Sequence, residues 1–166
     1  MNLFDTYLLK IKELLVKLNK DSLIKLPNEL KGINVDVPPP ELDFDISTNV
    51  AMVLSKPNKK SPDEIAILFS DHIKKYDNNI QNISIAKPGF INIKFKLAFW
   101  NNFLKEVLNT NEKFGTNLNY NKKKYLVEFV SANPTGPLHV GHCRGAILGD
   151  VISNILIFNN QEVTKE

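Results

Sequence analysis

The stretch from residue 125 to residue 166 constrains the fold most, because its hydrophobic pattern changes from strand to helix. Residues 125–130, Tyr-Leu-Val-Glu-Phe-Val, are a short, mostly apolar run that predicts a strand. A loop with proline and glycine follows, and then an apolar segment predicts a helix from about 140 to 158. Val163 and Thr164 begin what we expect to be the next strand. Strand, loop, long helix and strand are the opening of a βαβ unit.

This predicted βαβ unit is expected to be incomplete. A strand of a parallel sheet is covered on both faces, and a lone strand and helix cannot supply that cover. We therefore predict the start of an α/β Rossmann-like domain, truncated before its sheet is complete.

The residues before this unit predict a separate α+β domain, an antiparallel sheet with helices. Ser61-Pro62-Asp63-Glu64 has the pattern of a capping box with proline at the first helical position. Alternating isoleucines on either side of Lys87-Pro88-Gly89 predict a hairpin. Helices are expected over 3–18, 47–55, 61–76 and 97–108, and strands over 33–37, 83–85 and 91–95. The expected buried face of the last helix consists of Phe99, Trp100, Phe103, Leu104 and Val107.

A polar, asparagine-rich stretch separates the two parts. We predict a first domain over 1–114, a linker over 115–124 and the incomplete α/β domain over 125–166.

Composition narrows the class of protein. The 166 residues are 43% hydrophobic and 23% charged, which is typical of a globular chain. No apolar run approaches the roughly 18 residues of a membrane span, and no secretory signal is evident, so no membrane partner is expected. The single cysteine excludes an internal disulfide and a multi-cysteine metal site, and a cytoplasmic location is expected. The net charge of +3 permits a nucleic-acid partner without arguing for one.

The loop before the long helix holds the residues that could carry chemistry. His139 and His142 flank Val140-Gly141 where the helix should begin. Unpaired N–H groups at a helix start favour phosphates, and Gly141 would let a nucleotide approach the backbone. Pro134 and Pro137 stiffen the loop. This pattern alone leaves two interpretations open, a nucleotide site or two polar residues that only cap the helix.

The longer stretch resembles the HIGH motif of class I aminoacyl-tRNA synthetases, in the form found in arginyl-tRNA synthetases. Residues 128–131, Glu-Phe-Val-Ser, precede the motif, and residues 143–145, Cys-Arg-Gly, follow it. Segments 44–49, 61–64 and 87–92 also resemble that family's amino-terminal additional domain. The residues that match the motif are Ala132, Asn133, Pro134, Thr135, Gly136, Pro137, Leu138, His139, Val140, Gly141 and His142.

The resemblance implies an arginine–tRNA ligase, which activates arginine with ATP and transfers it to tRNA(Arg). It implies that His139 and His142 are catalytic and contact ATP, together with Pro134, Gly136 and Gly141. Mg2+ is expected to accompany ATP, and no structural metal is expected. The full enzyme is expected to be a monomer.

The resemblance also implies an arginine site. Glu128 matches a carboxylate that binds the cationic end of arginine, and paired charge-assisted hydrogen bonds suit that contact. Ser131 and Asn133 are implied to bind arginine as well. Asn49 matches an asparagine of the amino-terminal domain that can reach the same pocket.

Enzymes of this family continue far beyond such a segment, with the rest of the nucleotide fold, a KMSKS-type loop in many members and an anticodon-binding domain. We therefore expect this chain to be an inactive fragment by itself. One alternative is a tRNA-binding module without catalysis. Another is a nucleotidylyltransferase with a His-x-Gly-His motif, although that motif usually lies close to the amino terminus.

Overall fold

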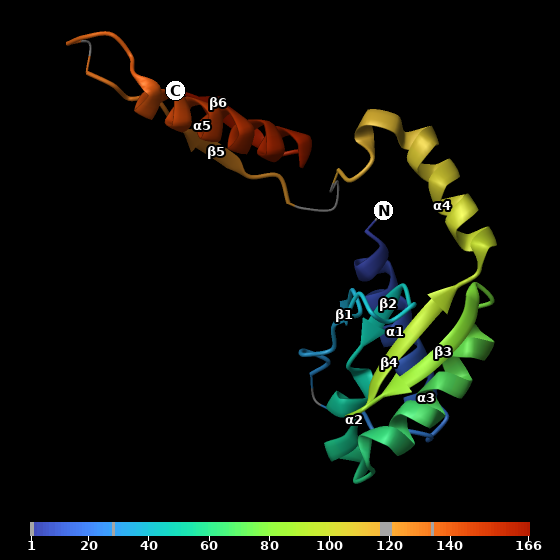
Figure 1. Cartoon of the computed structure of the whole chain (residues 1–166). Helices are drawn as coiled ribbons and strands as arrows, with labels where there is room; N and C mark the ends of the chain where they lie inside the picture. The colour runs from blue at the N-terminus through green and yellow to red at the C-terminus, as the bar shows by residue number, and fades with distance from the viewer. Residues whose placement is uncertain (1, 28, 117–120, 134) are drawn as a thin grey trace. The chain divides into compact units, whose positions relative to one another are not determined.

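The computed structural model describes residues 2–27, 29–116, 121–133 and 135–166. These residues divide into two compact units, Asn2–Asn109 and Thr110–Glu166, drawn as a ribbon in Figure 1.

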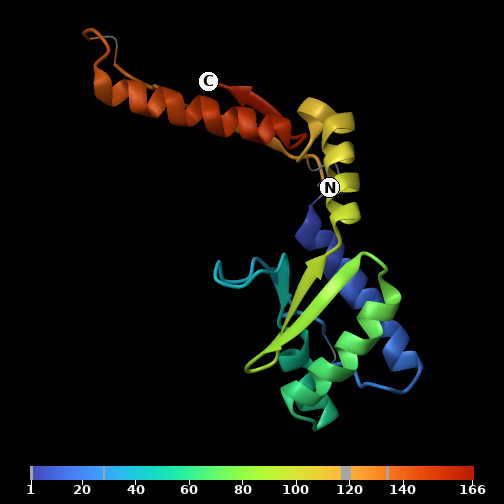
Figure 2. The ribbon, with the colours of Figure 1, turned by 45° about the vertical axis from the view of Figure 1, so that its right-hand side comes forward.

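The first unit is an antiparallel sheet covered by helices, as the sequence predicts. The strands are hydrogen-bonded in the order β1-β2-β4-β3, with Ile93 of β4 opposite Ile46 of β2 and Ile83 of β3. Helices α1 and α3 lie on the same side of this sheet (Figure 2). The elements are α1 Leu3–Lys20, β1 Val35–Asp36, β2 Ile46–Thr48, α2 Val50–Asn58, α3 Pro62–Tyr76, β3 Ile80–Ala86, β4 Phe90–Phe95 and α4 Leu97–Thr110.

Alternation along β4 sends one set of side chains into the core. Ile91, Ile93 and Phe95 are at most 2% exposed, and they meet the apolar faces of the helices. The Tyr7 ring of α1 packs against Phe95, with ring centroids 4.6 Å apart. The hydrophobic core of the described residues lies entirely between Tyr7 and Phe95, within the first unit.

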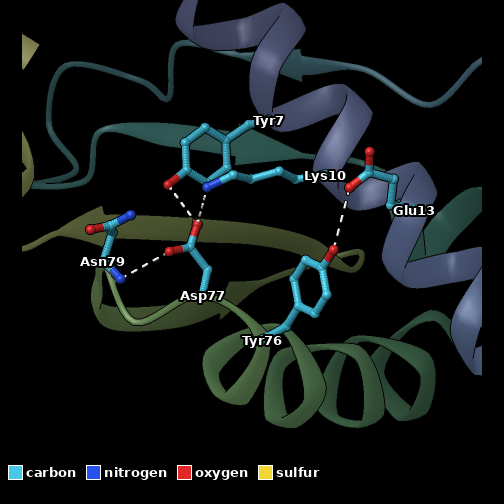
Figure 3. A network of polar contacts seen from close by, with 6 residues as sticks. All are labelled: Tyr7, Lys10, Glu13, Tyr76, Asp77 and Asn79. Atoms are coloured by element: carbon cyan, nitrogen blue, oxygen red, sulfur yellow. Dashed lines mark hydrogen bonds and ion pairs between the residues drawn. The ribbon is translucent and has the colours of Figure 1, made fainter.

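A buried carboxylate ties α1 to the turn between α3 and β3 (Figure 3). Asp77 accepts hydrogen bonds from the Tyr7 hydroxyl at 2.9 Å, the Lys10 ammonium at 2.7 Å and the Asn79 amide at 2.9 Å. Burial opposes the charged form of Asp77, but these hydrogen bonds and the Lys10 charge outweigh it and hold its pKa below the usual value. Burial, with the hydrogen bond and charge of Asp77, raises the pKa of Tyr7.

Three of the predicted helices of this unit and the hairpin are confirmed, and α1 covers the predicted 3–18. Helix α3 begins with the expected capping box, in which the Ser61 side chain accepts from the Glu64 amide and Glu64 accepts from the Ser61 amide. Helix α4 covers the predicted 97–108.

The helix predicted over 47–55 is wrong at its start, because Ile46–Thr48 is strand β2 and α2 begins at Val50. Strand β2 pairs with β1 and with β4, so ladder hydrogen bonds on both sides override the helical pattern. The strand predicted over 33–37 shortens to β1. The buried face predicted for α4 is wrong at Leu104, which is 56% exposed. Phe99 and Trp100 of that face are half-buried and pack against the core.

The second unit consists of a parallel strand pair and one long helix. Tyr125 of β5 lies opposite Val163 of β6, which is the expected βαβ arrangement. Lys165 donates to Asp150 at 2.6 Å and so links β6 to α5. The elements are the 3-10 helix η1 Asn111–Lys113, β5 Lys124–Val127, α5 Val140–Phe158 and β6 Glu162–Lys165.

Helix α5 matches its predicted bounds, but β5 ends three residues before the predicted 130. Val130 has a φ of 60°, in the left-handed region, so the chain cannot stay extended there. Residues 117–120 of the predicted linker lie outside the described residues, and the domain boundaries remain a prediction.

Candidate functional site

The chain turns sharply after β5 and brings two predicted arginine-binding residues together. The Phe129 amide donates to the Glu166 carbonyl at 3.0 Å, and Val130 then adopts its left-handed conformation. Beyond this turn the Ser131 hydroxyl donates to the Glu128 carboxylate. Both residues are exposed, so a ligand could reach the carboxylate from solvent.

A glycine in α5 holds the end of this strand against the helix. A Cβ at Gly149 would lie 2.3 Å from Cγ and 2.4 Å from Cβ of Phe129, so only glycine leaves room for that ring. This contact was not predicted from the sequence. The available signal was a glycine inside an apolar helix, which often marks a close approach of another segment.

The two histidines meet at the start of α5. Their ring centroids are 3.9 Å apart and their planes are inclined by 38°. His139 is the N-cap, and its Nδ1 accepts from the Gly141 amide at 3.1 Å. Nδ1 of His142 accepts from the His139 amide, also at 3.1 Å. His139 is exposed and His142 half-buried, so the pair both caps the helix and lies at the surface.

Gly141 makes room for a histidine ring of the chain itself. A Cβ there would lie 3.0 Å from Cε1 and 3.1 Å from Nδ1 of His139. The structure therefore accounts for Gly141 by the space that the His139 ring needs, whereas the sequence suggested space for a nucleotide.

The other motif residues form an open loop. Ala132 is half-buried, and Pro134 lies outside the described residues. The exposed members are Asn133, Thr135, Gly136, Pro137, Leu138 and Val140.

Asn49 belongs to the first unit, where its side chain braces a loop. It accepts from the Asn34 amide at 2.8 Å and donates to the Gly32 carbonyl at 2.8 Å. One N–H and one lone pair of the side-chain amide remain after these two bonds. Its arginine-binding role stays a prediction.

A hollow of about 550 Å³ lies at the other end of α5 from the histidines. It is lined by Asn121, Lys123, Tyr125, Leu156, Asn159 and Gln161, and none of these belongs to the predicted site. The described residues contain no cluster of three or more histidine, cysteine, aspartate or glutamate side chains able to hold a metal ion.

Two family matches decide the family of the chain. Residues 9–95 match the arginyl tRNA synthetase N terminal domain, and residues 103–166 match the catalytic domain of class I (R) tRNA synthetases. The chain belongs to the arginyl-tRNA synthetase family.

Similar curated proteins agree with this assignment. The chain is 64% identical over 166 residues to the arginine–tRNA ligase of Pelagibacter ubique (strain HTCC1062), covering all of this chain and 29% of that protein. It is 40% identical to the arginine–tRNA ligase of Brucella ovis, again over its whole length and 28% of that protein. The chain thus spans less than a third of the relatives it matches.

Solved structures agree on the fold. Thermus thermophilus arginyl-tRNA synthetase matches 94% of this chain and 24% of its own, with a TM-score of 0.59 and 24% identity. The Plasmodium falciparum arginyl-tRNA synthetase matches 93% of this chain and 29% of its own, with a TM-score of 0.66 and 21% identity. The predicted α+β domain followed by the start of a Rossmann-like domain is confirmed.

By length and composition, α5 is the one helix of the described residues that could cross a membrane. The sequence contains no unbroken apolar run of that length, so this property was not predicted. Arg144 and Asp150 place two charges within this apolar sequence, and the catalytic-domain match covers all of the helix. We therefore assign α5 to the α/β layer.

Proposed function

We propose that this chain is the amino-terminal part of an arginine–tRNA ligase, which joins L-arginine to tRNA(Arg) with ATP. The observation that carries the proposal is the family match over both units, with a HIGH-type sequence whose two imidazoles meet at the start of α5.

The first step is the attack of the arginine carboxylate on the α-phosphorus of ATP, which forms arginyl-adenylate and releases pyrophosphate. Negative charge builds on the phosphate oxygens, so fixed N–H donors aimed at them lower the barrier. His139 and His142 supply such donors, and Pro134, Gly136 and Gly141 are proposed to contact ATP as well. Mg2+ bound to ATP would neutralise further charge.

Arginine is held through its cationic end. The Glu128 carboxylate is exposed and can accept paired hydrogen bonds from a guanidinium. Ser131, which contacts Glu128, and Asn133 are proposed to orient the substrate. For Asn49, an arginine-binding role is proposed on the resemblance alone. A ribose hydroxyl at the end of the tRNA then attacks the arginyl carbonyl, and AMP leaves.

The 166-residue chain by itself is proposed to be inactive. Only Gly149 and Ser153 of α5 are buried, and the rest of the helix exposes apolar side chains that a complete sheet layer would cover.

Arginine-dependent exchange of pyrophosphate into ATP tests this function in the ligase that carries this segment. His139→Asn should lower exchange by roughly 10²–10³-fold, as loss of one transition-state donor does. The matched control is His72→Asn on α3, whose ring hydrogen-bonds the Leu68 carbonyl of its own helix and which should leave exchange unchanged. Pyrophosphate exchange at the same rate with and without arginine would refute the function. Exchange catalysed by the 166-residue chain alone would refute its proposed inactivity.

A second candidate function is tRNA binding by the first unit without catalysis. It is favoured by the closed core of Asn2–Asn109, which gives that unit a stable fold of its own. A gel-shift of the chain against tRNA tests it, and absence of any shift would remove this candidate.

A further inference from the structure

The backbone at the start of α5 holds both histidine rings through the same ring atom. Nδ1 of His139 accepts from the Gly141 amide, and Nδ1 of His142 accepts from the His139 amide. A backbone N–H can only donate, so each Nδ1 must offer a lone pair and cannot carry a proton.

A neutral imidazole carries its single proton on one of its two nitrogens. From these contacts we infer that the helix start fixes both histidines as Nε2–H tautomers, so that the pair presents two N–H donors to a phosphate group. No described residue hydrogen-bonds Nε2 of His139 or of His142, so both donors stay available.

The same contacts change how this helix start would hold an anion. The amides of His139 and Gly141 are occupied by imidazole nitrogens, so they are not the donors that the phosphate meets. The two Nε2–H groups take that place, on rings 3.9 Å apart. This step rests on the proposed function, because ATP supplies the phosphate.

Gly141 is the positioning residue for this arrangement. The His139 ring lies so close to it that a Cβ would approach Cε1 and Nδ1 to 3.0 and 3.1 Å. A Cβ there would force the ring to shift by a few tenths of an ångström, which would weaken its hydrogen bond to the amide that fixes its tautomer.

The tautomers can be observed directly in the 166-residue chain. Long-range proton–nitrogen correlation spectra of protein labelled with nitrogen-15 histidine show which ring nitrogen carries the proton. The spectra are recorded at about pH 8.5, well above the ordinary histidine pKa of about 6.5. We expect Nε2–H for His139 and His142. His72 is an internal control with the opposite tautomer, because its Nδ1 lies 2.8 Å from the Leu68 carbonyl, which can only accept.

Two glycine variants test the positioning role. Gly141→Ala should convert the His139 signals to a mixture of both tautomers. Gly145→Ala, one turn later with no atom within 4 Å of its added Cβ, should leave them unchanged. An Nδ1–H tautomer at either histidine of the unsubstituted chain would overturn the inference, even if a variant fails to fold. So would unchanged His139 signals in a folded Gly141→Ala chain. A failure of the pyrophosphate exchange assay would instead leave these spectra as expected, so the two failures are distinguishable.

Discussion

At the scale of single residues, two tyrosine–carboxylate hydrogen bonds of the first unit differ in burial. The Tyr7 hydroxyl is buried and donates to Asp77 at 2.9 Å, whereas Tyr76 is 42% exposed and its hydroxyl lies 3.3 Å from Glu13 (Figure 3). Buried hydrogen bonds to a charged group contribute more than bonds that water can replace.

Tyr7→Phe is therefore expected to lower the free energy of unfolding of the first unit by about 1.5–2 kcal/mol. Urea unfolding followed by Trp100 fluorescence measures this. Tyr76→Phe is the matched control and should unfold at the same urea concentration as the unsubstituted chain. Equal losses in the two variants would contradict the assignment of Asp77 as a buried anchor.

Asp77 also makes the first unit sensitive to acid. Its pKa is lower in the folded state, so its stabilisation is fully present above the unfolded carboxyl pKa of about 3.9 and is lost as the pH falls through the folded value. We expect the stability gap between the unsubstituted chain and Asp77→Asn to be widest near neutral pH and to close below about pH 4. Urea unfolding across that pH range tests this, and a constant gap would disagree.

At the scale of elements, the contact between the end of β5 and α5 depends on one missing side chain. The atoms nearest to a Cβ at Gly149 are Cγ and Cβ of Phe129, and the Phe129 Cβ cannot move away without moving the backbone. Gly145 faces open space on the same helix.

Gly149→Ala should therefore destabilise the second unit by about 1–3 kcal/mol, the usual cost of overpacking. Gly145→Ala should stabilise the helix by about 0.5–1 kcal/mol, because alanine is the better helix former. Amide hydrogen exchange along α5 measures both effects. Slower exchange in Gly149→Ala than in Gly145→Ala would show that Phe129 does not pack there.

Elements with strong local signals could be predicted from the sequence, and those set by distant partners could not. The capping box at Ser61 and the apolar sequence of α5 are local signals that do not depend on distant residues, so both helices lie where they were predicted. Strand β2 exists only because β1 and β4 lie on either side of it. His139 and His142 are three positions apart, so their contact could be predicted from the sequence. Phe129 and Gly149 are twenty positions apart, so their contact could not.

At the scale of the whole molecule, the hydrophobic core belongs to one unit. Asn2–Asn109 holds the core cluster, while α5 buries only Gly149 and Ser153. Its exposed apolar residues include Ile147, Leu148, Val151, Ile152, Ile155, Ile157 and Phe158.

Hydrogen exchange should therefore separate the two units. Amides of α1, α3 and β4 are expected to exchange only by global unfolding of the first unit, and those of α5 by local opening at much lower free energy. Mass spectrometry of peptides from each unit measures the difference, and similar protection in α5 and α3 would contradict it.

The bond between Ser131 and Glu128 sets a condition on any cation that enters the loop. The Ser131 hydroxyl occupies one lone pair of the Glu128 carboxylate, so a cation that binds both carboxylate oxygens shares one of them with the hydroxyl. A guanidinium adds its own positive charge to both hydrogen bonds, so it binds the carboxylate more strongly than a neutral group of the same shape. Replacing that cation by the neutral urea group of citrulline should therefore weaken binding to the Glu128 carboxylate.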